Sequence, residues 1–331
     1  MTVPVSVYRR RFITITASLL ATSAVSPSAL LAAPDVVRWR GVAMGAEAEL
    51  ILAHPDRDKA GRVLVSVENE ILRLEKIFSL FDPASRISRL NRDGVLDAPP
   101  VDLVRCLDDA DRISRITKGR FDVTVQPLWD VYADHFQRFP DDDKGPDKAV
   151  IHRALQKVDY KSVQFAPERV ALMKPGMKVT LNGIAQGYIT DRVAELLKSS
   201  GFENVLVNLG ETRALGGHRD GKDWQVGIKS PDGSGRLIEK LPLRNKAIAT
   251  SGGYGTRFTK DGVFNHLFDP LNGHSPTRWT SISVIADDAT RADALSTAFY
   301  SSPESFIKKI ARQLNVAVVA RHGSKDILVH I

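Results

Sequence analysis

The sequence predicts an α+β fold in which mixed or antiparallel sheets pack against helices, and it leaves open a division into two subdomains. Three observations predict this class. The composition, 43% hydrophobic and 26% charged over 331 residues, is that of a globular protein with material for a sizeable core. Apolar stripes at helical spacing occur in both halves of the chain, and residues 204–286 are mostly strand-like. Strands and helices do not alternate strictly, which argues against a doubly wound parallel sheet.

The first 33 residues have the pattern of an export signal. Arg9, Arg10 and Arg11 open a segment without Lys, Asp or Glu, a weakly apolar run follows, and small residues end it at Ala33. The run is too short and too rich in hydroxyls for a membrane-spanning helix. Arg9 to Phe12 resembles the twin-arginine export motif, with a general secretory signal or an uncleaved anchor as the alternatives. We expect cleavage near Ala33, one domain over residues 34–331, and a periplasmic protein exported by the twin-arginine route.

Charge and cysteine usage exclude several classes of function. Removing the three signal arginines from a chain of net charge +7 leaves +4, a mild excess that gives no argument for a nucleic-acid partner. A single cysteine excludes a disulfide framework and a zinc site built on several thiolates. Cys106 lies on the apolar stripe of a predicted helix, so we expect it to pack in the core. No segment after the signal is apolar enough to span a bilayer.

The first half of the mature chain is predicted as helices between short strands. A strand over residues 42–52 precedes a long helix, residues 56–80, which ends in the turn at residues 81–85. A second helix is predicted from Asp102, as its N-cap, to Gly119. The segments after it are predicted as a buried strand at 121–129, a polar loop at 141–146 and a short helix at 147–158.

The second half is predicted as short strands, a helix, a strand-rich region and two more helices. Strands are expected at residues 163–165 and 179–181, followed by a Gly-rich turn and a helix over 184–199. Mostly strands follow from 204 to 286. The closing elements are helices at 291–300 and 303–314 and strands at 316–320 and 327–330.

The most informative polar motif is Ala292-Asp293-Ala294-Leu295-Ser296-Thr297. Asp293 and Thr297 are four residues apart, so they project from one face of a helix. One carboxylate and one hydroxyl suit Mg²⁺, which completes its coordination with water and phosphate oxygens. The alternative is a capping box from Thr290 to Asp293, in which Asp293 only closes the start of the helix.

Two further stretches combine glycines with polar side chains. Gly183 and Gly187 flank the start of the helix that carries Asp191, where free N–H groups attract anions. Thr250-Ser251-Gly252 could bind phosphate, and His266 could act as an acid or base near neutral pH. Each has a plain structural alternative: a tight strand-to-helix turn and a hydrogen-bonded histidine. A hydrolase triad is disfavoured because no Gly-x-Ser-x-Gly elbow is present.

Taken together, these segments resemble the ApbE family, the FAD:protein FMN transferases. The resemblance covers nearly all of the chain after the signal, and the matching blocks occur in the family's order. They are Met44-Gly45; Phe81-Asp82-Pro83 with Ser85 and Asn91; Gly119 with Phe121-Asp122; Gly183-Ile184-Ala185 with Gly187-Tyr188 and Asp191; Asn208-Leu209-Gly210; Trp224 with Gly227 and Pro231; Thr250-Ser251-Gly252; His266 with Asp269-Pro270 and Gly273; and Ala292 to Thr297.

The resemblance implies an ApbE-like fold and a Mg²⁺-dependent enzyme. Such an enzyme splits the diphosphate of FAD, attaches FMN to a Thr or Ser hydroxyl of an acceptor protein and releases AMP. By position, Asp293, Thr297 and the carbonyl of Ala185 match the metal ligands, and His266 and Asp293 match the catalytic residues. The positions that match FAD-binding residues are Met44, Phe81, Asp122, Gly183, Tyr188, Asp191, Thr250, Ser251 and Gly252.

Three positions depart from the family's pattern. Gln186 stands where Lys is common, Glu211 where a second Gly is usual, and Phe81 where Tyr is often found. These departures leave two alternatives open: an FAD pyrophosphatase that gives free FMN and AMP, and a non-catalytic flavin carrier or maturation factor. By resemblance, the acceptor is a NosR-, NqrC- or RnfG-like flavoprotein, and the leader and departures suit the exported NosX-type branch, which serves nitrous-oxide reductase.

Overall fold

The centre of the fold is an antiparallel sheet. The computed structural model describes residues 36–329 apart from 55, 219, 231–233 and 324, so the predicted export signal lies outside the described residues. Within them, eight strands pair antiparallel in the order β1-β2-β6-β7-β10-β11-β12-β13. Their bounds are β1 Val36–Ala43, β2 Ala46–Ala53, β6 Val205–Asn208, β7 Thr212–Leu215, β10 Ala247–Ser251, β11 Ser281–Ala286, β12 Ala317–His322 and β13 Lys325–Val329.

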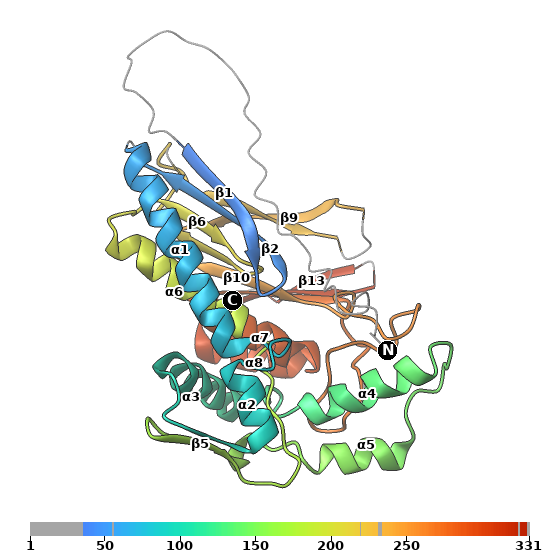
Figure 1. Cartoon of the computed structure of the whole chain (residues 1–331). Coiled ribbons are helices and arrows are strands. Elements are labelled where there is room, and N and C mark those ends of the chain that lie inside the picture. Colours follow the sequence, from blue (N-terminus) through green and yellow to red (C-terminus); the bar gives the residue numbers. More distant parts are fainter. Residues whose placement is uncertain (1–35, 55, 219, 231–233, 324, 330–331) are drawn as a thin grey trace.

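The two faces of this sheet are covered by different elements. Successive strand residues point to opposite faces, and Leu50 and Leu52 join the large core against α1 (Arg57–Phe78), α6 (Ala185–Ser199) and α7 (Ala289–Tyr300). Ile51 points the other way and packs with Trp224 and Leu243 of the hairpin β8 (Trp224–Lys229) and β9 (Leu237–Leu243). Figure 1 shows α1 and α6 lying along the sheet. Burial on both faces fixes the register of the strands.

The remaining elements form a second layer below the sheet in Figure 1. The helices are α2 (Arg86–Asp93), α3 (Val101–Ile116), α4 (Gln126–Arg138), α5 (Lys148–Leu155) and α8 (Glu304–Leu314), and the small antiparallel sheet is β3 (Val95–Asp97), β5 (Arg169–Leu172) and β4 (Val163–Phe165). Helices α4 and α5 share a separate apolar cluster with Phe268 and the neighbouring loop. The α+β class with antiparallel sheets and packed helices is therefore confirmed.

The predicted helices are confirmed, with their ends shifted by a few residues. Helix α1 begins after Asp56, whose carboxylate accepts a hydrogen bond from the backbone N–H of Lys59 at 2.8 Å. Helix α5 begins after Asp147, which caps the N–H of Ala149 in the same way. Cys106 is fully buried in the core, and burial raises the pKa of its thiol well above the usual value. It is a core residue, as expected.

The single strand predicted at residues 42–52 is wrong. The segment belongs to a hairpin of two strands, β1 and β2, joined at Met44 and Gly45, whose φ angles are 50° and 78°. Two successive positive φ angles are typical of a tight two-residue hairpin turn. The Met44 backbone N–H also donates to Glu75 of α1 at 2.6 Å, which ties the turn to the helix.

Three other local predictions are corrected. Residues 121–129 are not a strand, since helix α4 begins at Gln126 with Pro127 in its first turn. Residues 179–181 lie outside any strand, because the side-chain amide of Asn91 bonds both the N–H and the carbonyl of Val179. Asp102 is not the N-cap of α3, which follows Pro100; it is buried inside the first turn.

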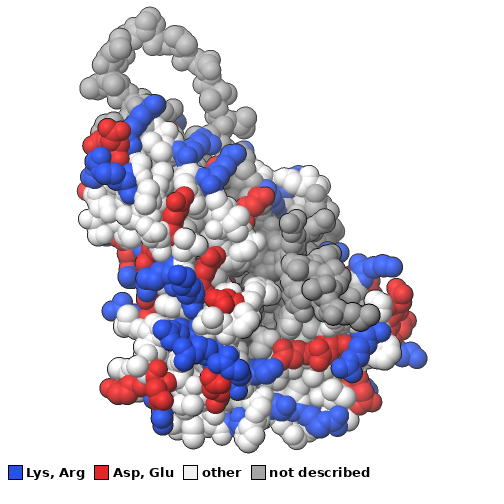
Figure 2. Space-filling model, in the orientation of Figure 1, with Lys and Arg blue, Asp and Glu red and all other residues white. Residues whose placement is uncertain are grey.

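The surface carries charges of both signs. Figure 2 shows Lys and Arg side chains interspersed with Asp and Glu over the visible face. Within the described residues, no helix combines the length and the hydropathy that crossing a membrane requires.

Candidate functional site

The candidate site is built where helix α7 meets helix α6. Gly187 of α6 allows a close approach: a Cβ atom there would lie 2.2 Å from the carbonyl oxygen of Ala289 and 2.9 Å from the Cβ of Asp293. The Gly187 N–H donates to Oδ2 of Asp293 at 3.0 Å. Asp293 is only 4% exposed. The glycine is needed at this position because any side chain would separate the two helices.

A second carboxylate fixes the start of α7. Asp191 accepts hydrogen bonds from the backbone N–H groups of Ala289 and Thr290 at 2.9 and 2.8 Å, and from the Thr290 hydroxyl at 2.7 Å. Asp288 is the N-cap and accepts from the N–H of Arg291. Asp293 is therefore not the closing residue of a capping box, and that alternative is wrong. Burial raises the pKa of Asp191 to about 6, against the lowering effect of Arg213 and these hydrogen bonds.

Hydroxyl groups gather one helical turn after Asp293. The hydroxyl of Ser251, at the end of β10, lies 2.7 Å from that of Ser296 and 3.2 Å from that of Thr297. A Cβ atom at Gly183 would lie 2.9 Å from the Thr297 hydroxyl, so this glycine packs directly against Thr297. The fold thus brings Asp293 and Thr297 of α7, Ser251 of β10 and Gly183 before α6 together from three segments. Gly252, the next residue after Ser251, is buried.

Two buried polar residues border the same cluster. Glu211 follows Gly210 in the turn between β6 and β7, is 7% exposed, and accepts from the Thr250 N–H at 3.3 Å. Burial, together with the nearby Asp293 carboxylate, raises the pKa of Glu211 well above its usual value. Gln186 of α6 is 3% exposed, and its Nε2 has no hydrogen-bond partner among the described residues.

The oxygen donors of this cluster fit a hard divalent cation. Within the described part of the chain, no group of three or more His, Cys, Asp or Glu side chains could hold a metal ion alone. Mg²⁺ does not need such a cage, because it binds one or two carboxylates and completes its coordination with water and phosphate oxygens. Asp293, Glu211 and Thr297 supply this chemistry. Ala185, the buried first residue of α6, is two residues from Gly187.

His266 lies in the long loop between β10 and β11. Its Nδ1 is 3.1 Å from the carbonyl oxygen of Thr256 and 3.2 Å from the Thr256 N–H. When Nδ1 carries the proton and donates to that carbonyl, Nε2 is left unprotonated and can accept a proton. The same loop is attached to α7, because the Gly253 N–H donates to the Tyr300 hydroxyl at 3.1 Å.

The other predicted FAD-binding side chains make structural contacts of their own. Asp122 is buried and accepts from the N–H and hydroxyl of Thr124 and from the N–H of Tyr160; burial raises its pKa to about 6 despite these bonds. Tyr188 donates its hydroxyl to Asp102 at 2.8 Å and packs edge-on against Phe78. Phe81, by contrast, is 58% exposed in the turn after α1, and Met44 is half-buried at the β1–β2 turn.

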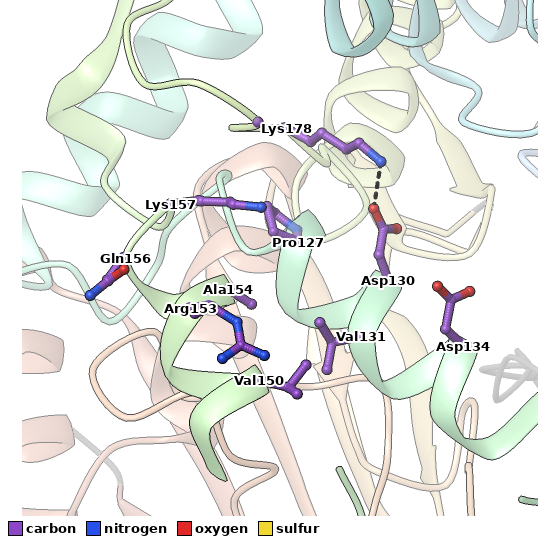
Figure 3. Close-up of a pocket in the computed structure, with 11 residues that line it drawn as sticks. Pro127, Asp130, Val131, Asp134, Val150, Arg153, Ala154, Gln156, Lys157 and Lys178 are labelled. Atoms are coloured by element: carbon purple, nitrogen blue, oxygen red, sulfur yellow. Dashed lines mark hydrogen bonds and ion pairs between the residues drawn. The ribbon is translucent and has the colours of Figure 1, made fainter. Parts of the chain in front are cut away.

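A separate pocket of about 440 Å³ lies between α4 and α5. Figure 3 shows two of its lining side chains, Lys178 and Asp130, pointing toward each other, at an N–O distance of 2.7 Å. Its other charged lining residues include Asp134, Arg153 and Lys157. None of the predicted site residues lines this pocket, so it is distinct from the cluster around Asp293.

Sequence reasoning misses the polar neighbours of the predicted ligands. In the sequence, Ser296 is noticed only as part of the motif from Ala292 to Thr297. Glu211 and Gln186 are noticed only as departures from the family's usual residues. The sequence signal that could have singled out Glu211 is its place between two apolar strand segments, because a carboxylate is rarely buried unless it is paired. The nearness of Glu211 to Asp293 depends on the pairing of β7 with β10 and is not readable from the sequence.

Known proteins resemble this chain over most of its length. The model of the ApbE family matches residues 44–320. The FAD:protein FMN transferase of Haemophilus influenzae is 31% identical over 250 residues, which is 72% of this chain and 72% of that protein. The FAD:protein FMN transferase of Vibrio cholerae is 31% identical over 244 residues, 70% of this chain and 72% of that protein.

Solved structures share the fold. The ApbE protein of Thermotoga maritima matches with a TM-score of 0.77 and 27% identity, covering 89% of this chain and 97% of that one. The flavin transferase ApbE of Vibrio cholerae matches with a TM-score of 0.76 and 24% identity over the same shares.

Proposed function

The chain belongs to the ApbE family, and on this premise we propose that it is an FAD:protein FMN transferase. It takes FAD as substrate and joins FMN to a hydroxyl of an acceptor protein. The observation that carries the proposal is the convergence of Asp293, Thr297, Ser251 and Gly183 beside the α6–α7 contact. That cluster combines side-chain oxygens that can bind a cation with a backbone segment, at Gly183, that packs closely against them.

The proposed metal is Mg²⁺, held by Asp293, Thr297 and the carbonyl of Ala185. When bound, such an ion neutralises charge on the diphosphate and so lowers the barrier to attack. The buried Glu211 carboxyl group and the hydroxyls of Ser251, Ser296 and Thr297 support this assignment, because together with Asp293 they form an oxygen-rich environment.

We propose that the other site residues bind the flavin nucleotide and move one proton. Phe81, exposed in the turn after α1, offers a face on which the flat flavin ring can stack. His266 accepts the proton of the acceptor hydroxyl at Nε2. The hydroxyl oxygen then bonds to the FMN phosphorus, the bond from that phosphorus to the bridging oxygen breaks, and AMP leaves with that oxygen.

The acceptor and the compartment are also proposals. We propose a periplasmic protein, delivered by the twin-arginine route, that modifies a Thr or Ser of an exported or membrane flavoprotein. The Arg9-Arg10-Arg11-Phe12 segment supports the route. A NosR-, NqrC- or RnfG-like acceptor and membership of the NosX-type branch rest on the sequence resemblance alone.

The test is an acceptor-labelling assay. The purified protein is incubated with FAD, Mg²⁺ and a candidate acceptor, and the products are separated on a denaturing gel and by chromatography. We expect a flavin-fluorescent acceptor band and one AMP for each FMN attached. An acceptor whose target Thr is changed to Ala, and a reaction with a chelator, are the matched controls and should give no band.

The same assay separates the competing functions. Free FMN and AMP without a labelled acceptor would contradict transfer and support an FAD pyrophosphatase, since water would then take the place of the acceptor hydroxyl. FAD that binds but stays unchanged with every acceptor would support a flavin carrier and reject both enzymatic functions.

A further inference from the structure

Glu211 reaches the candidate site from a different part of the fold than the proposed metal ligands. It follows Gly210, whose φ is 100°, in the β6–β7 turn. Strand β7 pairs antiparallel with β10, which places Glu211 beside Thr250. The Thr250 N–H donates to its Oε2 at 3.3 Å, and the next residue, Ser251, hydrogen-bonds with Thr297. The carboxylate of Glu211 is therefore held at the Ser251 end of the Asp293 cluster.

The charge of Glu211 is not balanced by a basic side chain of the described residues. The residue is 7% exposed, and no Lys or Arg in the described part of the chain forms an ion pair with it. Asp293 is 4% exposed and lies one helical turn before Thr297, whose hydroxyl contacts Ser251, so a second buried carboxyl group belongs to the same cluster. Two buried carboxylates at one place are costly unless a cation joins them.

The amide of Gln186 is an independent indication that a ligand binds here. A Cβ atom at Gly210 would lie 2.6 Å from Nε2 of Gln186, so the amide packs against the residue that precedes Glu211. That Nε2 is buried and lacks a partner within the described residues. A buried donor without a partner costs free energy, and a phosphate or metal-bound water would satisfy it.

We propose that Glu211 supplies the second carboxylate charge of the metal site formed by Asp293 and Thr297. Two carboxylates match the charge of a divalent ion, and the Gln186 amide lies beside them as a donor for the oxygens that the ion brings. This proposal rests on the proposed function for the identity of the metal. It assigns to Glu211 a role in holding the ion rather than in proton transfer.

The test measures metal binding without FAD or acceptor. Mn²⁺ serves as a probe for Mg²⁺, and its dissociation constant is measured by electron paramagnetic resonance and calorimetry on the wild-type chain, Glu211→Gln and Glu203→Gln. Glu203 is exposed just before β6, so its variant removes one carboxylate of the same kind from the surface. Glu211→Gln should weaken Mn²⁺ binding by about tenfold or more, as loss of a supporting carboxylate does elsewhere. Glu203→Gln should leave it unchanged.

A melting experiment keeps the proposal separate from a purely structural role. Without metal, Glu211→Gln should melt at the same temperature as the wild type or higher, because a buried carboxyl group without a basic partner is replaced by a neutral amide whose oxygen can still accept from Thr250. With metal, it should gain less stability than the wild type. Unchanged Mn²⁺ affinity in Glu211→Gln, or a lower melting temperature without metal, would overturn the proposal. Neither result bears on FMN transfer, which the labelling assay tests by itself.

Discussion

At the scale of single residues, the site depends on short side chains held by backbone contacts. Asp293 and Thr297 have few rotatable bonds, so their oxygens are placed by helix α7 and lose little entropy on binding. The Gly187 N–H orients Asp293, and the Thr256 backbone orients His266. The role of each of these side chains can therefore be tested by a substitution that keeps the shape of the side chain, or by one that removes the side chain.

Asp293→Asn should abolish most of the Mg²⁺-dependent FMN transfer while leaving the fold intact. The amide oxygen can still accept from Gly187, but the negative charge is lost. We expect a fall of roughly 10²-fold or more in the rate of acceptor labelling, as for loss of a key electrostatic group. Circular dichroism checks the fold, and full Mg²⁺-dependent activity in this variant would reject Asp293 as a ligand.

His266→Ala should slow transfer far more than it weakens FAD binding. Loss of a general base costs roughly 10²- to 10⁴-fold in rate, whereas the imidazole has no necessary part in holding the nucleotide. Single-turnover labelling measures the first quantity and fluorescence titration with FAD the second. Equal losses in both would indicate that the ring, which bonds the Thr256 backbone, is structural.

At the scale of elements, the position of α7 against α6 decides the geometry of the site. Gly187 permits the contact, and Asp191 bonds the first N–H groups of α7. Asp102 of α3 contributes a second set of contacts to α6, through Tyr188 at 2.8 Å, and to α1, through Arg73 at 2.8 Å. Asp191 and Tyr188, which the sequence predicts as FAD-binding residues, thus also fix the positions of α6 and α7.

Gly187→Ala should destabilise the protein by about 1–3 kcal/mol, because the added methyl group would lie 2.2 Å from a backbone oxygen that cannot move freely. The free energy of unfolding in urea measures this effect. Gly61→Ala is the control, since a Cβ atom there meets nothing within 4 Å. Equal effects of the two substitutions would show that the α6–α7 approach is looser than described.

Asp102→Asn should cost about 2 kcal/mol near pH 7, because it removes the charge that faces Arg73 and Arg192. This value is below that of a fully buried pair, since Arg73 is 46% exposed. Burial alone would raise the pKa of Asp102, but hydrogen bonds from Arg73 and Tyr188 hold it below 3.8.

The pH dependence of this stabilisation follows from that lowered pKa. The contribution of Asp102 is present above its usual pKa of 3.8 and is lost as the pH falls through the lower value of the folded state. The difference in unfolding free energy between wild type and Asp102→Asn should therefore be constant from about pH 8 to about pH 5 and shrink below about pH 4. A difference that grows on acidification would contradict this.

At the scale of the whole molecule, the two faces of the large sheet are covered by different elements with different roles. The hairpin β8–β9 closes one face, and the helices α1, α6 and α7 close the other and hold the candidate site. Residues of the site come from β10, α6, α7 and the β6–β7 turn, which are distant in sequence. Ligand binding at their junction should therefore stabilise the fold as a unit.

Mg²⁺ and FAD together should raise the melting temperature of the protein. Ligands at about 100 times their dissociation constants would stabilise the folded state by about 2.7 kcal/mol each. Scanning calorimetry with FAD alone, Mg²⁺ alone and both measures the effect. A shared metal–diphosphate site requires the two ligands to strengthen each other's binding. It would be contradicted if the rise in melting temperature with both ligands did not exceed the sum of the rises with FAD alone and with Mg²⁺ alone.

The amino-acid sequence alone is enough to assign the class of fold, the long helices and the family. Periodic apolar stripes specify helices such as α1 and α6 because burial of one face dominates their stability. The four-residue spacing of Asp293 and Thr297 likewise puts both side chains on one face of α7. Local patterns are less informative at the β1–β2 turn and at residues 121–129, where apolar runs suit a strand, a turn or a helix start alike.

Which polar groups meet depends on the tertiary packing. The Asn91 amide takes the place of a strand partner for Val179, Asp191 bonds the start of a helix about a hundred residues away in the chain, and Glu211 bonds the Thr250 backbone next to Ser251. Such contacts arise from antiparallel pairing and helix packing between distant segments, which no local pattern encodes. The sequence therefore determines which chemical groups are available, whereas the tertiary packing determines which two or three of them meet at one point.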